Sequence, residues 1–207
     1  MSAQPTSFVG RVRELAEIAA LLRDPGCRLL SVIGPGGIGK TRLVAEVARR
    51  LAEPGAEVVF APLQALASAA ELPAAIASAA GIALTGPGEP RVQLLSQIRG
   101  RRLILVLDSF EHLLDGAGLL GDLLAAADGL RLVVTTRESL NLQDEWLFPL
   151  DGLDIPGAGQ RGDIAGYAAV QLFVERARRA RGEFALDAER DAVLRICRLV
   201  EGMPLAI

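Results

Sequence analysis

Eight residues, from Gly34 to Thr41, combine glycine, lysine and threonine at a spacing that suits phosphate binding. They fit the pattern G-x-x-x-x-G-K-[ST] and stand between an apolar run, Leu29–Ile33, and a helical pattern that reaches Leu51. Glycines let backbone N–H groups turn inward around phosphate oxygens, and a helix that follows directs its positive end at the same anion. The segment is therefore predicted to bind a nucleotide; a purely structural glycine turn is the alternative.

Lysine and threonine at the end of this segment have separate expected roles. Lys40, the only lysine in the chain, would place a mobile positive charge on the β and γ phosphates. Thr41 would bind Mg²⁺ through its hydroxyl. The residues predicted here to bind ATP or ADP are Gly34, Gly36, Gly37, Ile38, Gly39, Lys40, Thr41 and Arg42.

A second candidate group follows the apolar run Leu103–Leu107, which ends in Asp108. A carboxylate at the end of a strand beside the glycine loop would hold Mg²⁺ and its water, because hard cations prefer oxygen ligands. The alternative is an aspartate that only forms a turn. Glu111, three residues on, is predicted either to polarise a water molecule or to be a carboxylate in the first turn of a helix.

A third candidate is Arg137, which follows the short apolar run Leu132–Val134 and two threonines. In open parallel sheets, ligands bind at the carboxyl ends of the strands. Arg137 is therefore predicted to contact the γ-phosphate and to report its presence. A solvated loop arginine is the other interpretation.

These groups require strands and helices in alternation, and the pattern predicts an α/β fold. We expect a P-loop-type parallel sheet with helices on both faces, followed by a small helical lid domain. The predicted domains are residues 1–155 and 156–207, with a linker at 156–166. Strands are expected at 29–33, 57–63, 103–107, 132–134 and 146–150, a loop at 85–90, and helices after Gly10 and at 43–51, 68–80, 119–127, 167–181 and 187–201.

Composition narrows the function classes. The 207 residues carry a formal net charge of −3, which argues against direct nucleic-acid binding. The arginine run 176–181 is predicted to be a solvated helix face. Cys27 and Cys197 are expected as buried apolar side chains, and a single histidine, His112, excludes multi-histidine metal centres and is expected to cap or pack. No apolar run is long enough to span a bilayer, so a cytoplasmic protein without membrane partners is predicted.

Five short motifs follow one another along the chain: Phe8–Arg11, Gly34–Thr41, Leu107–Leu113, Thr135–Arg137 and Gly202–Ile207. In this order they resemble the signal-transduction ATPases of the STAND class, and specifically their NB-ARC-like bacterial branch. That branch includes regulators with LuxR-type or SARP-type DNA-binding domains and proteins with tetratricopeptide arrays. The resemblance implies a switch controlled by ATP and ADP, with Mg²⁺ as cofactor and self-association of the full-length protein in its ATP state.

The resemblance also implies roles for single residues. Val9 and Arg11 correspond to the segment that touches adenine, and Pro204 to the proline that packs on adenine from the helical lid. Lys40 and Thr41 correspond to the phosphate and Mg²⁺ ligands, Asp108 to the Walker B acid and Arg137 to the sensor arginine.

The chain departs from this branch in two places, and the relatives are longer. Val12 stands where glutamate is frequent, and Ser109 stands where asparagine or aspartate follows the acid, so slow hydrolysis is expected. Relatives continue beyond the position of Ile207 into a winged helix and an effector or sensor region. The resemblance therefore implies the excised core of a longer protein, with transcription regulation as one output of the effector region. A conventional phosphotransferase and a non-hydrolysing scaffold are the alternatives.

Overall fold

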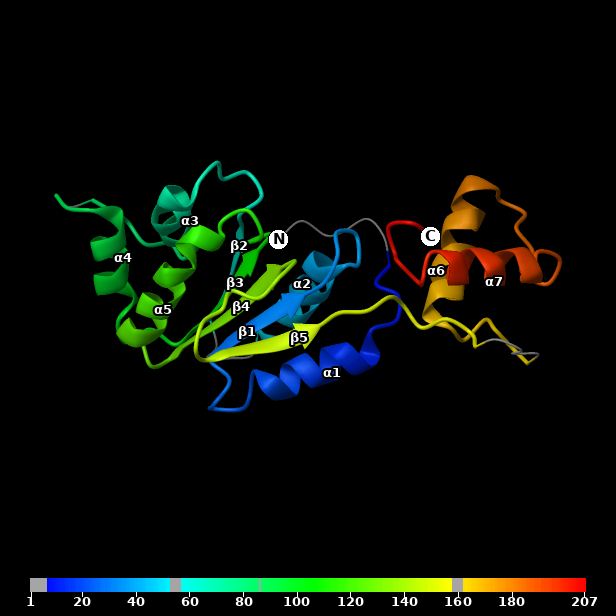
Figure 1. Ribbon diagram of the computed structural model, residues 1–207, viewed down its shortest axis with the longest axis horizontal. Coiled ribbons are helices and arrows are strands. Elements are labelled where there is room, and N and C mark those ends of the chain that lie inside the picture. The colour runs from blue at the N-terminus through cyan, green and yellow to red at the C-terminus, as the bar shows by residue number, and fades with distance from the viewer. Residues whose placement is uncertain (1–6, 53–56, 86, 158–161) are drawn as a thin grey trace. The chain divides into compact units, whose positions relative to one another are not determined.

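Five parallel strands form one sheet in the order β2-β3-β4-β1-β5 (Figure 1). Their bounds are β1 Leu29–Ile33, β2 Glu57–Pro62, β3 Leu103–Asp108, β4 Leu130–Thr136 and β5 Glu145–Pro149. Because β3 and β4 are buried at almost every position, both faces of the sheet are covered. The computed structural model, which describes residues 7–52, 57–85, 87–157 and 162–207, thus confirms the predicted α/β class and all five predicted strands.

Helices pack against this sheet and supply most of its core. Helix α2 contacts β2, β3 and β4, α3 contacts β2, and α5 contacts β4. Aliphatic residues of strands and helices form one cluster, to which β3 contributes Leu103, Leu105 and Leu107. The helix bounds are α1 Val12–Leu21, α2 Lys40–Leu51, α3 Leu72–Ala79, α4 Pro90–Ile98, α5 Ala117–Ala126, α6 Ala168–Ala180 and α7 Arg190–Leu199, with 3-10 turns η1 Ala69–Glu71 and η2 Leu114–Gly116.

Two stretches differ from the sequence prediction. The predicted helix at 68–80 is divided into η1 and α3, because Pro73, in the first turn of α3, has no N–H to continue the hydrogen bonding from η1. Helix α4 was not predicted at all. Its apolar side chains at the core are Leu94 and Ile98, which are buried, and Leu95, which is partly buried, and this run of barely one turn is too short to indicate a helix. In the predicted loop at 85–90, residue 86 lies outside the described residues.

The chain forms two compact units. The larger contains Leu15–Gly34 and Lys40–Pro149, with the sheet; the smaller contains the described residues up to Glu14, the glycine loop Pro35–Gly39, and Leu150–Ile207. In the smaller unit, α6 and α7 bury a core that includes Val170, Val193 and Cys197, as the two predicted helices require. The sequence had not indicated that the glycine loop groups with this unit. Residues 158–161 of the predicted linker lie outside the described part of the chain.

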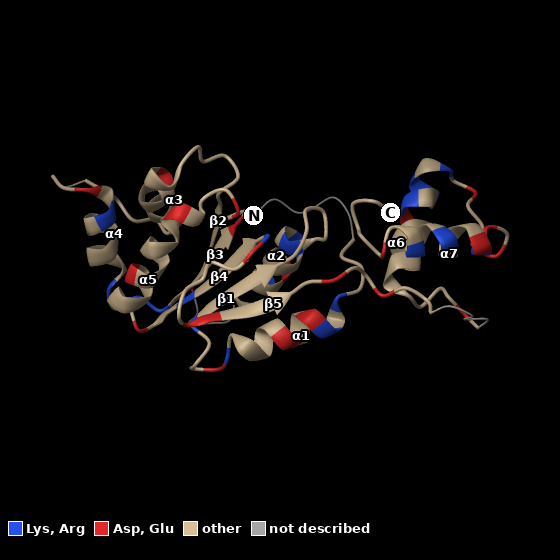
Figure 2. Ribbon diagram, viewed as in Figure 1, with Lys and Arg blue, Asp and Glu red and all other residues tan. Residues whose placement is uncertain are grey.

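The cysteines and the arginines of α6 are buried or exposed as the sequence predicts. Cys27 and Cys197 are both buried. Arg178 and Arg179 lie in the last turn of α6 and are exposed, as expected of a solvated helix face. Figure 2 shows the Lys and Arg positions of the ribbon in blue, α6 included. His112 is exposed, with its Nε2 3.1 Å from the Leu66 carbonyl oxygen. Among the described helices, none has the length and apolar character needed to cross a membrane.

Candidate functional site

The glycine loop begins where β1 ends and reaches α2, whose first residue is Lys40 (Figure 1). Gly37 has φ of 83° and Gly39 has φ of 100°, in the region that only glycine adopts without strain. A Cβ atom on Gly37 would also lie 2.7 Å from the Cβ of Leu205. The loop therefore depends on glycine for its backbone conformation and, at Gly37, for space.

Lys40 is nearly buried at the start of α2, with 8% of its surface exposed. Its Nζ donates a hydrogen bond to the Gly34 carbonyl oxygen at 2.7 Å. Burial lowers the pKa of Lys40 below its usual value; the carboxylate of Glu111 opposes this shift, the guanidinium of Arg137 adds to it, and the carboxylate of Asp108 opposes it. These charges therefore lie within electrostatic reach of the lysine.

Asp108 ends β3 with 2% of its surface exposed and holds a small hydrogen-bond network. Its Oδ1 accepts a hydrogen bond from Thr41 Oγ1 at 2.8 Å and another from Thr135 Oγ1 at 2.7 Å. Thr135 Oγ1 accepts in turn from the backbone N–H of Ser109 at 2.8 Å. The structure thus brings together Thr41 and Asp108, the two residues predicted to bind Mg²⁺.

The donor atoms of this network fit Mg²⁺. Mg²⁺ takes oxygen ligands and is usually held by one or two protein oxygens together with water and substrate phosphates. The hydroxyl of Thr41 and the carboxylate of Asp108 are such oxygens, and no described residue donates a hydrogen bond to Asp108 Oδ2. In the described ranges no group of three or more His, Cys, Asp or Glu side chains could hold a metal ion by itself.

Glu111 and Arg137 form an ion pair near this network. Arg137 Nε lies 3.5 Å from Glu111 Oε1, with the side chains 64% and 26% exposed. The second oxygen, Glu111 Oε2, is buried, and within the described chain it has no hydrogen-bond partner. Glu111 lies in a turn between β3 and η2, so the interpretation that placed it in the first turn of a helix is wrong.

Most of the other predicted residues lie in the smaller unit. Arg11 is 8% exposed, and its guanidinium donates to the carbonyl oxygens of Asp151 at 2.5 Å and Ile38 at 3.3 Å. Val9 is partly buried against the core of this unit. A Cβ atom added to Gly39 would lie 3.9 Å from Pro204 Cγ, so this proline lies beside the glycine loop. Arg42 is partly buried in the first turn of α2, in the larger unit. The adenine contacts of Val9, Arg11 and Pro204 stay predictions.

Thr135 is the residue of this site that sequence reasoning missed. It is 1% exposed and joins Asp108 to the backbone of Ser109, which has φ of 68°. The available signal was a pair of threonines at the end of an aliphatic strand, where buried hydroxyls need partners. The sequence does not show that the partner comes from β3, because strand pairing is decided by the tertiary fold.

The lowered pKa of Lys40 gives a measurable pH dependence. We expect the single lysine, labelled with ¹³C at Cε, to titrate in the free protein with a midpoint below 10.5, its usual pKa. Phosphates favour the ammonium form, so Mg-ADP should raise the midpoint, and nucleotide affinity should fall as pH rises through the lower pKa. A midpoint at or above 10.5 in the free protein would contradict the effect of burial on the pKa of Lys40, and no change with Mg-ADP would contradict the placement of Lys40 at the phosphates.

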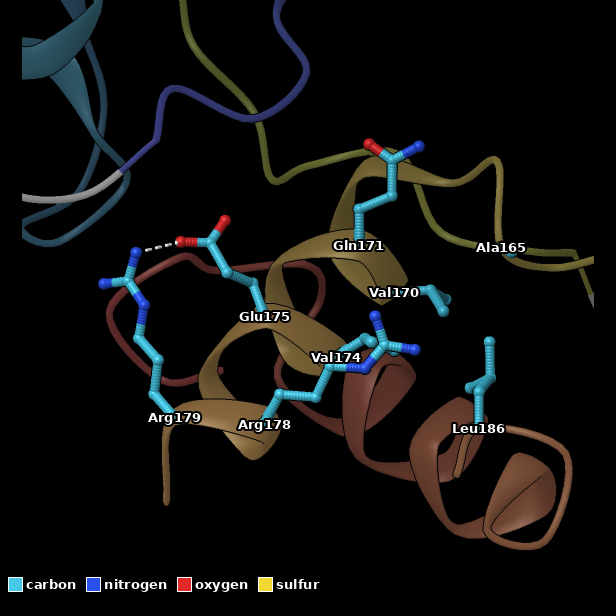
Figure 3. A pocket seen from close by; sticks show the side chains of 8 residues that line it. All are labelled: Ala165, Val170, Gln171, Val174, Glu175, Arg178, Arg179 and Leu186. Carbon is cyan, nitrogen blue, oxygen red and sulfur yellow. Dashed lines mark ion pairs between the residues drawn. The ribbon is translucent and has the colours of Figure 1, made fainter. Parts of the chain in front are cut away.

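A separate cavity of about 550 Å³ lies in the smaller unit (Figure 3). Its lining combines apolar side chains of α6, such as Val170 and Val174, with the ion pair of Arg179 and Glu175, whose Nη2 and Oε1 atoms are 2.6 Å apart. None of the predicted site residues lines it. The chemistry described above therefore does not involve this cavity.

Comparison with known proteins agrees with this geometry. Residues 7–187 match the AAA ATPase domain family. An uncharacterized protein of Mycobacterium tuberculosis is 33% identical over 209 residues, covering 98% of this chain and 49% of that protein. A protein of the same organism named as a candidate HTH-type transcriptional regulator is 33% identical over 138 residues, covering 64% of this chain and 14% of the regulator. The chain thus spans about half the length, or less, of these relatives.

Solved structures show the same fold. A STAND protein with a tetratricopeptide repeat sensor from Pyrococcus horikoshii has a TM-score of 0.56 at 19% identity, covering 98% of this chain and 29% of that one. The ORC2 protein of Aeropyrum pernix in its ADP form has a TM-score of 0.60 at 16% identity, covering 99% and 62%. The resemblance to STAND-class P-loop ATPases is therefore confirmed at the level of the fold, and by the match over residues 7–187 the chain belongs to the AAA ATPase domain family.

Proposed function

We propose that this chain is the nucleotide-controlled switch core of a larger signalling protein, which binds ATP or ADP with Mg²⁺ and hydrolyses ATP slowly. The observation that supports this best is the network of Thr41, Asp108 and Thr135 around one carboxylate oxygen, in the same unit as Lys40. A hydroxyl and a carboxylate placed in this way can hold Mg²⁺ while the lysine neutralises the phosphates.

Four residues of the larger unit have a defined part in the proposed reaction. Lys40 exchanges its hydrogen bond to Gly34 for the β and γ phosphates, and Thr41 and Asp108 hold Mg²⁺, which supplies charge neutralisation when bound. Glu111 accepts the proton of the attacking water as the bond from the γ-phosphorus to the bridging oxygen breaks, giving ADP and phosphate. Its buried and unpartnered Oε2 supports this role, because such an oxygen is poorly satisfied without a water or a proton.

A non-hydrolysing scaffold is the second candidate, and Ser109 favours it. The residue after Asp108 supplies no acid, and its N–H is already bound to Thr135. Glu111 is then the carboxylate that would activate a water molecule for hydrolysis. Its Oε1 is already in an ion pair with Arg137. Slow turnover, with binding rather than hydrolysis carrying the signal, is consistent with both features.

The output of the switch is also a proposal. We place it in the cytoplasm and expect the full-length protein to self-associate in its ATP state. The relative named as a candidate HTH-type regulator supports transcription control as one output. We expect any nucleic-acid binding to come from regions outside this chain.

Replacing Arg137 tests the switch directly. Arg137→Ala is expected to weaken binding of a non-hydrolysable ATP analogue about tenfold or more while changing ADP affinity less than about threefold. A charge-assisted bond to a γ-oxygen is worth roughly 1.5 to 3 kcal/mol, and ADP offers no such oxygen. The measurement is the ratio of the two dissociation constants in Mg²⁺ by calorimetry.

Arg102→Ala is the matched control, since Arg102 is an exposed arginine of the same unit. It should leave both dissociation constants unchanged. Equal losses for both nucleotides in Arg137→Ala would make Arg137 a structural residue. No loss of affinity for either nucleotide would show that Arg137 is a solvated loop arginine without a role in binding.

A further inference from the structure

Two successive carbonyl groups at the tip of the glycine loop are bound from within the smaller unit. The Gly37 carbonyl oxygen accepts a hydrogen bond from the backbone N–H of Leu205 at 3.2 Å. The Ile38 carbonyl oxygen accepts one from Arg11 Nη2 at 3.3 Å. We infer that Arg11 and the Leu205 N–H form a carbonyl clamp that sets the direction of the phosphate-binding N–H groups of the loop.

The reason is the geometry of the peptide bond. In a planar trans peptide, the carbonyl of one residue and the N–H of the next point in opposite directions. Holding the Ile38 carbonyl toward Arg11 therefore turns the Gly39 N–H away from Arg11, and holding the Gly37 carbonyl toward Leu205 turns the Ile38 N–H away from Leu205. Ile38 N–H makes a long bond of 3.4 Å to the Pro35 carbonyl across the loop, whereas no described residue accepts from the Gly39 N–H. The loop thus presents the Gly39 N–H as an open donor that points away from Arg11.

Arg11 is built for this positioning role. Besides Ile38, its guanidinium donates to the carbonyl oxygens of Asp151 and Gly152 at 2.5 Å and 3.4 Å, and Nη1 pairs with Glu14 Oε1 at 2.6 Å. These bonds use four of the five guanidinium N–H groups, so little of the side chain remains for a ligand. Arg11 itself has φ of 62°, an unusual conformation for a side chain of this size, which the surrounding bonds hold in place.

The clamp orients backbone donors that a phosphate needs and acts through the loop. It therefore makes Arg11 a positioning residue for phosphate rather than a contact to adenine. Pre-oriented donors cost no reorganisation when the anion binds, so losing the clamp should weaken binding without removing any direct contact. This inference rests on the proposed nucleotide binding, and the experiment separates the two.

Inorganic pyrophosphate, which has no base, is the deciding probe. We expect Arg11→Ala to lower the affinity for Mg-pyrophosphate and for Mg-ADP by the same factor, about tenfold or more, by calorimetry. In ¹⁵N spectra the Gly39 amide signal should move with pyrophosphate in the wild type and much less in the variant. Arg11→Lys, which keeps a charged donor but not the planar fork, should lose less than Arg11→Ala, and Arg23→Ala, at an exposed arginine, should lose nothing.

Each other outcome has one meaning. A loss for ADP with unchanged pyrophosphate affinity would overturn the clamp and make Arg11 an adenine contact. Unchanged affinity for both would also overturn it. If Arg11→Ala does not fold, Arg11→Lys decides: an unchanged Gly39 response together with unchanged pyrophosphate affinity would overturn the inference. If the wild type binds neither ADP nor pyrophosphate, the proposed function fails instead.

Discussion

Lys40→Ala is expected to abolish measurable binding of Mg-ATP and Mg-ADP while the fold stays intact. The variant removes the mobile cation at the start of α2, and each charge-assisted bond to a phosphate is worth roughly 1.5 to 3 kcal/mol. Two such bonds correspond to a loss of about 100-fold or more in the dissociation constant. Calorimetry with both nucleotides measures it directly.

The fold of this variant can be checked independently. Burial disfavours the charged form of Lys40, while alanine also removes its hydrogen bond to the Gly34 carbonyl, so the two effects oppose each other and the free energy of unfolding should change little. Circular dichroism and the melting temperature without nucleotide give this control. Binding within about threefold of the wild type, a difference under about 1 kcal/mol, would show that the glycine loop is not the phosphate site.

Asp108→Asn is expected to have the second largest effect, a fall in ATP hydrolysis of about 100-fold or more. An amide oxygen can still accept the hydrogen bonds from Thr41 and Thr135, so the network keeps its shape. The variant loses only the negative charge that would hold Mg²⁺. Its affinity for ADP without Mg²⁺ should therefore match the wild type, while the gain from adding Mg²⁺ should be small.

Turnover of the wild type and of Asp108→Asn is measured by following ADP formation, with Asp128→Asn, an exposed acid, as control. The wild type should turn over well below the ~1 to 100 s⁻¹ of kinases. Several turnovers per second would contradict the switch and favour a conventional enzyme. Nucleotide binding with no hydrolysis at all would support the scaffold.

Local patterns in the sequence were enough for the strands and for the phosphate-binding loop. Leu103–Leu107 is aliphatic throughout and Leu29–Ile33 is aliphatic except for Ser31, and such short apolar runs are typical of strands that are buried on both faces of a sheet. The loop was visible because its glycines, Lys40 and Thr41 are adjacent in the chain, so their spacing alone carries the chemistry. Helix α4 was missed because the side chains that it packs against the core all lie within the short run from Leu94 to Ile98.

Contacts between distant segments were decided by the tertiary structure alone. Thr135 reaches Asp108 only because β3 and β4 are neighbours in the sheet, and the sequence does not state strand order. Arg11 donates to Ile38 and Asp151, which are 27 and 140 residues away along the chain. A buried guanidinium must find acceptors somewhere, but which carbonyl groups it finds depends on the folded path of the backbone. The residues with the chemistry for a phosphate site can thus be recognised from their order along the chain. The residues that hold them in position can be recognised only in the folded protein, because those hydrogen bonds join segments that no local pattern connects.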